Sequence, residues 1–110
     1  MPKHEFGLMN NPPVESKRYD EYNPEKYNSV ISVDDNYIMR IYDELNKIHM
    51  YWHTLKKSQK GLAYYGITLI PPEATTEMLS ITEEYPELQQ LTHLLQKARA
   101  ENKYIIHFGI

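Results

Sequence analysis

Two histidines four residues apart, His49 and His53, are the first candidates for chemistry, and they stand in the bulky stretch HMYWHT. On a helix, residues at this spacing lie about 6 Å apart and can share a zinc ion. On a strand they share one face but lie roughly 13 Å apart, which is too far for chelation. The zinc-protease signature also requires Glu after the first His, where this chain has Met50. Because we favour a strand here, we expect no metal site.

Other catalytic motifs are missing from the sequence. The chain has no cysteine, which removes thiol nucleophiles and Cys-ligated metals, and it has no G-x-S-x-G or S-x-x-K motif. Its four glycines stand alone, so no phosphate-binding loop is expected and we expect no cofactor. Asp34 and Asp35 are adjacent and could form an acid pair, but their place before a periodic segment favours helix capping.

A polar pocket on a sheet face is the remaining candidate for a ligand site. In LAYYGITLI (62–70) the more apolar face is assigned to the core on the helix side of the sheet, and it consists of Ala63, Tyr65, Ile67 and Leu69. Gly66 on the other face has no side chain to fill space. If two histidines point the same way, the candidate ligand-binding residues on this open face are His53, Tyr64, Thr68 and His107. The alternative is a partly solvated sheet face or a subunit interface.

A tyrosine-rich loop is the candidate for binding a partner. The stretch KRYDEYNPEKY (17–27) carries Tyr19, Tyr22 and Tyr27 among alternating charges. Tyrosine and arginine dominate interface hot spots. Alternatively, the three rings fold back over the domain and hold the loop in place.

The elements that would position these residues follow from periodicity and turn signals. We expect strands at 4–9 and 27–33, separated by a long irregular loop at about 10–27 that carries three prolines. A helix follows from Tyr37, because apolar residues recur at three- and four-residue spacing to Ile48. A helix continued to residue 60 would be about 39 Å long. That length exceeds the roughly 34 Å diameter expected for the domain. We therefore favour a strand near 50–55, the turn KKSQKG and a second strand at 62–70, although a helix over 49–56 stays open.

The second half of the chain predicts two more helices and a last strand. IPPE (70–73) and YPE (85–87) each place Pro and Glu where a helix can begin. Asn102 is a residue type that can end the second of these helices in a left-handed turn. YIIHFGI (104–110) is apolar almost throughout, as expected of a buried strand. The expected fold is a single α+β domain over 1–110, with a four- or five-stranded antiparallel or mixed sheet and three helices mainly on one face.

Two sequence segments resemble those of known proteins. KGLAYYGITLIPPE, at residues 60–73, together with YIIHFGI, resembles a group of small uncharacterised bacterial proteins of similar length and acidic balance. The resemblance implies no activity, because none is known for the group. In general type the chain is also similar to the immunity proteins of bacterial toxin systems, which are small, acidic α+β domains.

Composition limits the function classes further. With 12 Lys and Arg against 15 Asp and Glu, the net charge of −3 provides no field for nucleic acid. No stretch approaches the ~20 apolar residues of a membrane span, and the N-terminal residues lack the apolar core of a signal peptide, so we expect a cytoplasmic protein. The leading interpretation is a non-catalytic protein-binding module whose partner is another protein or a second copy of itself. The alternative is a small enzyme or ligand-binding domain that uses the polar pocket.

Overall fold

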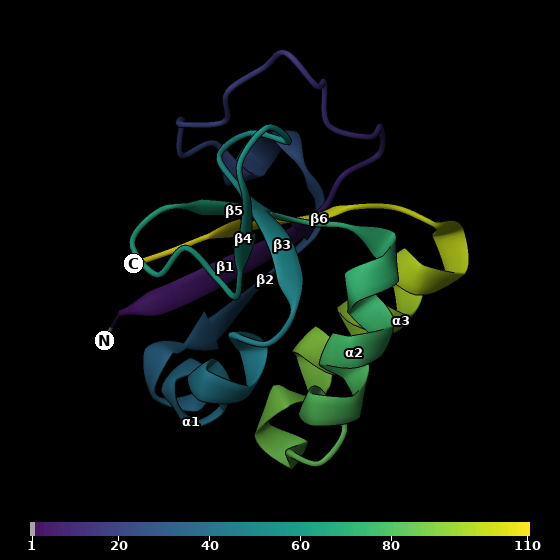
Figure 1. Cartoon of the computed structure of the whole chain (residues 1–110). Coiled ribbons are helices and arrows are strands. Elements are labelled where there is room, and N and C mark those ends of the chain that lie inside the picture. Colours follow the sequence, from purple (N-terminus) through teal and green to yellow (C-terminus); the bar gives the residue numbers. More distant parts are fainter. Residues whose placement is uncertain (1) are drawn as a thin grey trace.

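A six-stranded, fully antiparallel sheet forms the centre of the computed structural model, which describes residues 2–110 (Figure 1). The strand order is β2-β1-β6-β5-β3-β4, which places β6 between β1 and β5. The strands are β1 (Lys3–Leu8), β2 (Asn28–Asp34), β3 (His49–Trp52), β4 (Ser58–Lys60), β5 (Ile67–Ile70) and β6 (Ile105–Phe108).

The expected number of four or five strands is wrong by one, because the predicted turn at 56–61 contains β4. After β3 the chain turns within residues 53–57 and returns as β4, which pairs with β3 at the sheet edge. Gly61 then adopts a left-handed backbone with φ of 82°, and a Cβ added there would clash with Asn46. Residues 61–66 leave the sheet as a loop before β5 pairs with the other side of β3. The favoured strand near 50–55 is present as β3 but ends at Trp52, and the strand expected at 62–70 is confined to β5.

Three helices cover one face of the sheet, as expected (Figure 1). They are α1 (Asp35–Leu45), α2 (Pro72–Thr82) and α3 (Gln89–Glu101), with short 3₁₀ turns η1 (Pro24–Lys26) and η2 (Pro86–Leu88). The Asp34 carboxylate accepts a hydrogen bond from the backbone N–H of Asn36 and caps α1. Pro72 begins α2, and Asn102 ends α3 with a left-handed φ of 54°.

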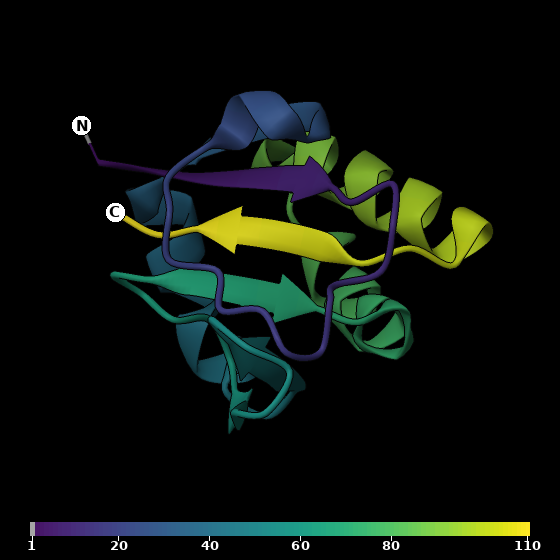
Figure 2. The same cartoon turned by 90° about the horizontal axis from the view of Figure 1, so that it is seen from above.

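The sheet is buried on both faces, so the expected open face is wrong. On the helix side, Phe6, Leu8, Ile70 and Ile105 pack against the helices. On the opposite side, Ile67, Leu69, Ile106 and Phe108 form a second core. Figure 2 shows the long loop between β1 and β2, residues 9–27, crossing this second face over β6 and β5.

The sequence assignment of the two faces of β5 is therefore reversed. We expected Ile67 and Leu69 to face the helices, but they lie under the 9–27 loop. Thr68 lies instead on the helix side, where its side chain meets that of His107 on the neighbouring strand. An apolar pattern could not distinguish the faces, because both are covered.

Candidate functional site

A buried chain of hydrogen bonds joins four side chains on the helix side of the sheet. The Thr68 hydroxyl lies 3.0 Å from His107 Nδ1, and His107 Nε2 lies 2.8 Å from His4 Nδ1. His4 Nε2 lies 2.8 Å from an oxygen of the Asp35 carboxylate. Thr68, His107 and His4 are fully buried, whereas the Asp35 side chain is 12% exposed. We call these residues, together with Tyr64, the histidine network.

Tyr64 closes the exposed end of the histidine network. Its hydroxyl donates to the Asp35 carboxylate, at 2.6 and 2.7 Å from the two oxygens. At the other end, the backbone N–H of Ala63 donates to the Thr68 hydroxyl oxygen at 2.8 Å. Both ends of the network therefore hold the 61–66 loop, which joins β4 to β5.

The strand register brings these residues together. Thr68 of β5 and Phe6 of β1 are both paired with His107 of β6, so His107 sits between them at the centre of the sheet. His4 precedes Phe6 by two residues, which places it on the same face of β1. Asp35 is the first residue of α1 and follows β2 directly, and β2 pairs with β1.

A single order of donors satisfies the whole network when both histidines are neutral. An ionised Asp35 only accepts, so His4 Nε2 carries a proton and His4 Nδ1 accepts from His107 Nε2. His107 Nδ1 then accepts from the Thr68 hydroxyl, whose oxygen accepts from Ala63. Within residues 2–110, no buried side-chain nitrogen or oxygen lacks a partner. The network therefore meets the requirement that buried polar groups be paired.

The protonation states follow from burial and from the hydrogen bonds. Burial lowers the pKa of His107 well below 6.5 and keeps this imidazole neutral, and repulsion would further oppose a charge on His107 whenever His4 carried one. Burial alone would raise the pKa of Asp35, but hydrogen bonds from Tyr64 and His4 outweigh it and lower the pKa below 3.8. The hydrogen bond to Asp35, with a smaller effect of desolvation, raises the pKa of Tyr64 to about 12.

These properties suit a structural network better than acid–base chemistry. A general base works best with a pKa near neutral pH, whereas the pKa of Asp35 is lowered and that of Tyr64 is raised away from neutrality. The two imidazoles have no exposed surface on which a substrate could be placed. The network instead links the N-terminal strand, α1, β6 and the 61–66 loop.

Of the four predicted ligand-binding residues, three lie in the network and His53 does not. His53 follows β3, with a left-handed φ of 65°, and its Nδ1 lies 2.9 Å from the Tyr19 carbonyl oxygen and 2.8 Å from the Asp20 carboxylate. Its ring fills the space above Gly66, where an added Cβ would lie 2.5 Å from His53 Nε2. His53 and Gly66 line a hollow of about 330 Å³ that contains none of the other three predicted residues, so the four residues do not share one pocket.

The tyrosines of the predicted partner loop lie in different environments. Tyr19 is only 8% exposed and packs in the second core, and its hydroxyl accepts the backbone N–H of Val14. Tyr27 is partly buried against the same core. Tyr22 is 64% exposed, although its ring packs edge to face with that of Phe108 and its hydroxyl donates to Glu5.

Tyr65 has the most exposed of the large hydrophobic side chains in residues 2–110, with 81% of its surface in contact with water. It stands in the 61–66 loop between two hollows. The first, about 620 Å³, is lined by Met39, Tyr42, Asp43, Tyr64 and Tyr65. The second, about 330 Å³, includes Asp20, Tyr22, His53, Tyr65 and Ile110 in its wall. Sequence reasoning placed Tyr65 in the core, so it missed this surface.

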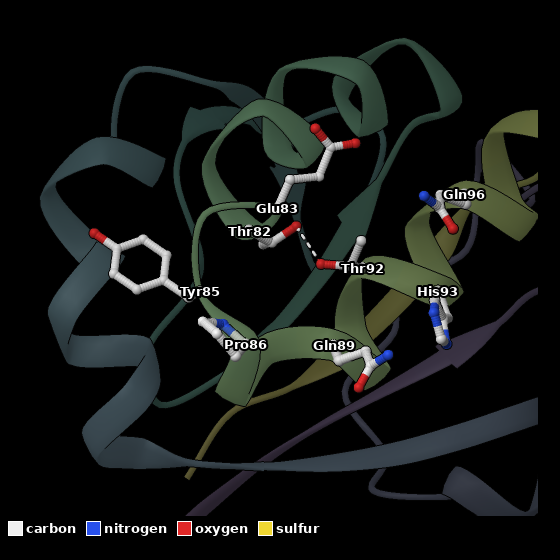
Figure 3. Close-up of a pocket in the computed structure, with 8 residues that line it drawn as sticks. All are labelled: Thr82, Glu83, Tyr85, Pro86, Gln89, Thr92, His93 and Gln96. Carbon is white, nitrogen blue, oxygen red and sulfur yellow. Dashed lines mark hydrogen bonds between the residues drawn. The ribbon is translucent and has the colours of Figure 1, made fainter.

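A further hollow of about 360 Å³ lies between α2 and α3 (Figure 3). Its wall contains Glu83 and His93, whose side chains point apart, and the Thr92 hydroxyl donates to that of Thr82 at 3.0 Å. The side chains that line this hollow do not converge on one point as an acid–base pair or a ligand set would, so the hollow is not a candidate site.

No protein-family model matches the chain, and neither a curated protein nor a solved structure matches it at a significant level. Within residues 2–110, no three His, Asp or Glu side chains converge closely enough to hold a metal ion. Over the same range, none of the helices has the length and apolar character needed to cross a membrane.

Sequence reasoning missed two members of the network, His4 and Asp35. Asp35 was expected to cap α1 as an alternative to Asp34, but Asp34 holds the cap and leaves Asp35 free to bind His4 and Tyr64. His4 carries no local signal, because its contact with His107 depends on β1 pairing with β6 across almost the whole chain.

Proposed function

We propose that the protein is a non-catalytic protein-binding module whose partner contacts the surface around Tyr65. This Tyr65 surface consists of Tyr22, Met39, Tyr65 and Ile110, the four large side chains that line the two neighbouring hollows and are exposed. The 81% exposure of Tyr65 is the observation that carries the proposal. A partner that covers this ring removes a large apolar area from water, which is the main source of binding free energy at aromatic hot spots.

The rigidity of the 61–66 loop supports this proposal. The histidine network holds Tyr64 and Ala63, and the Tyr64 and Tyr65 rings pack edge to face with their centroids 4.9 Å apart. Gly109 and Ile110 donate backbone hydrogen bonds to the carbonyl oxygens of Gly66 and Tyr64, respectively. A loop fixed in this way loses little conformational entropy when it binds.

Charge around the Tyr65 surface indicates the kind of partner. Asp43 lines the hollow on one side of Tyr65, whereas Asp20, which lines the hollow on the other side, is already paired with Arg18 at 2.7 Å. A complementary partner would offer an apolar pocket for the ring, with Lys or Arg side chains at its rim. This role replaces the predicted contacts of Tyr19 and Tyr27, whose rings are packed against the sheet.

The experiment is affinity capture from a lysate of the source organism, quantified by mass spectrometry. The wild-type chain, a Tyr65→Ser variant and a Val14→Ser variant are compared after thermal melts have shown that all three are folded. Val14 is the matched control, because it is 56% exposed and lines neither hollow.

We expect one protein to be captured in stoichiometric amounts by the wild type and by Val14→Ser. Its capture by Tyr65→Ser should fall by a factor of about 30, as for the loss of an aromatic hot spot. Equal capture by all three forms would reject the Tyr65 surface. A concentration-dependent dimer that Tyr65→Ser abolishes, with no other protein captured, would mean that the partner is a second copy.

A further inference from the structure

The larger hollow beside Tyr65 has walls of an unusual kind. It measures about 620 Å³ and lies between α1 and the 61–66 loop. Met39, Tyr42 and Asp43 are spaced by three and four residues, so they share one face of α1. Tyr64 and Tyr65 supply the other wall, which makes three of the five lining residues tyrosines.

The Tyr64 ring stands almost at right angles to the rings of both Tyr42 and Tyr65. The Tyr42 and Tyr64 rings are 5.5 Å apart between centroids with an interplanar angle of 84°, and the Tyr64 and Tyr65 rings are 4.9 Å apart at 86°. Two of the rings are anchored, since the Tyr42 hydroxyl donates to the Leu62 carbonyl oxygen and the Tyr64 hydroxyl donates to Asp35. The hollow therefore has a fixed aromatic corner.

The charge of the hollow is negative. The face of each aromatic ring carries partial negative charge, and Asp43 adds a full charge to the wall. The Tyr64 hydroxyl donates to a carboxylate, and this increases the electron density of its ring. Among residues 2–110, the cations that lie over rings are Lys17, Arg40 and Lys57, and they cover Tyr19, Tyr37 and Trp52 rather than these three tyrosines.

We propose that this hollow binds an alkylated ammonium group, such as a quaternary ammonium compound or a methylated lysine. Aromatic corners attract cations through the ring quadrupole, and recognition of quaternary ammonium groups is a known use of such cages. An unmethylated ammonium is compact and strongly hydrated, so its transfer from water into the hollow costs more free energy. N-Methyl groups instead present an apolar surface that fits the rings and Met39 while the charge faces Asp43.

The inference does not rest on the proposed function, because free ammonium compounds test it without a partner. The first experiment is a titration of the full chain with choline, followed by NMR of the Met39 methyl group and of the tyrosine ring protons. The matched ligand is 3,3-dimethylbutanol, in which carbon replaces the charged nitrogen of choline. Sodium chloride at equal ionic strength is the reference.

Choline should shift the Met39 signal with a dissociation constant of about 1 mM or tighter. The neutral analogue should bind at least tenfold more weakly, because it lacks the cation–ring attraction. Equal binding of the two ligands would overturn the proposal and leave only an apolar hollow. No response to choline beyond that to sodium chloride would overturn it as well.

Variants at exposed positions locate the site without threatening the fold. Tyr65→Leu keeps an apolar side chain but removes the ring, so choline binding should weaken about tenfold, whereas Tyr65→Phe should retain it. Asp43→Asn should weaken binding severalfold, and Glu44→Gln, an exposed neighbour outside the hollow, should leave it unchanged. Equal affinities of Tyr65→Leu and Tyr65→Phe would reject the cage.

The source of the ammonium group is decided by two further ligands. Peptides with trimethyl-lysine and with unmodified lysine are titrated alongside choline. Tighter binding of the trimethyl-lysine peptide than of choline would support the proposal with a protein source, and the reverse order would support it with a small-molecule source. Preference for the unmodified lysine peptide would contradict the requirement for alkylation.

Discussion

At the residue scale, Asp35 is the group on which the histidine network depends. Its carboxylate accepts from His4 and Tyr64 while the cap of α1 is made by the neighbouring Asp34. These two adjacent aspartates therefore have separate roles that substitution can distinguish.

Asp35→Asn should destabilise the protein, because an amide offers one oxygen and a competing NH₂ group to two donors. Hydrogen bonds to a charged group are worth about 1.5–3 kcal/mol, so we expect a loss of about 2 kcal/mol in the free energy of unfolding. Asp34→Asn is the matched control and should change it by less than about 0.5 kcal/mol, since Asn caps helices as well as Asp does. Urea denaturation measures both, and equal losses would show that the network contributes no more than the cap.

His107 predicts how stability depends on pH. Its pKa in the folded protein is well below 6.5, the value for histidine in an unfolded chain. At a pH between the folded and the unfolded pKa, the unfolded chain binds a proton that the folded protein does not. The contribution of neutral His107 to the free energy of unfolding is fully present above about pH 7. It is lost as pH falls below about 6.5, with a slope of up to about 1.4 kcal/mol per pH unit.

Urea denaturation between pH 8 and pH 5 measures this slope. Asp35 adds a second loss at lower pH, because its lowered pKa gives stability that is present above 3.8 and disappears as pH falls through the folded value. A free energy of unfolding that stays constant from pH 7.5 to pH 5.5 would contradict the neutral, buried state of His107.

At the element scale, the 9–27 loop acts as a cover for one face of the sheet. Tyr19 fixes it in two ways, because its ring packs in the second core and its backbone N–H donates to the His53 carbonyl oxygen. The imidazole of His53 lies against the Tyr19 carbonyl oxygen, so the loop is attached to the turn after β3.

Tyr19→Ala should destabilise the protein by about 2–4 kcal/mol, the range expected when a large buried ring is removed from a core. The melting temperature should fall by roughly 10–20 °C. Tyr22→Ala is the control in the same loop and should hardly change the melting temperature, because most of its ring is in water. Similar melting temperatures for the two variants would mean that the loop does not stabilise the sheet.

At the scale of the whole molecule, the sequence was sufficient for the elements that depend on local patterns. The α+β class, the three helices, the Asn102 helix end and the buried last strand all follow from periodicity, caps and turn residues. The residues missed are those whose environment depends on distant segments. The 9–27 loop buries the second sheet face, so Ile67 and Leu69 face the loop while Thr68 faces the helices.

The candidate sites show the same division. Tyr64, Thr68 and His107 were predicted to lie together with His53 on an open sheet face, but the structure brings the three together on the helix side and without His53. His4 joins them only through the pairing of β1 with β6. Tyr65 was assigned to the core by alternation along a strand. Residues 61–66 form a loop, where alternation does not apply, and the ring is therefore exposed.

Photo-crosslinking from position 65 tests the central claim most directly. Tyr65 is replaced by p-benzoylphenylalanine in the source cells, and the same replacement at the exposed position Glu87, on the helical side, serves as the control. We predict that illumination links position 65 to one protein that position 87 does not capture, and that the linked sites of this protein lie near Lys or Arg. A Tyr65 surface that crosslinks to nothing, or to the same set of proteins as position 87, would contradict the account.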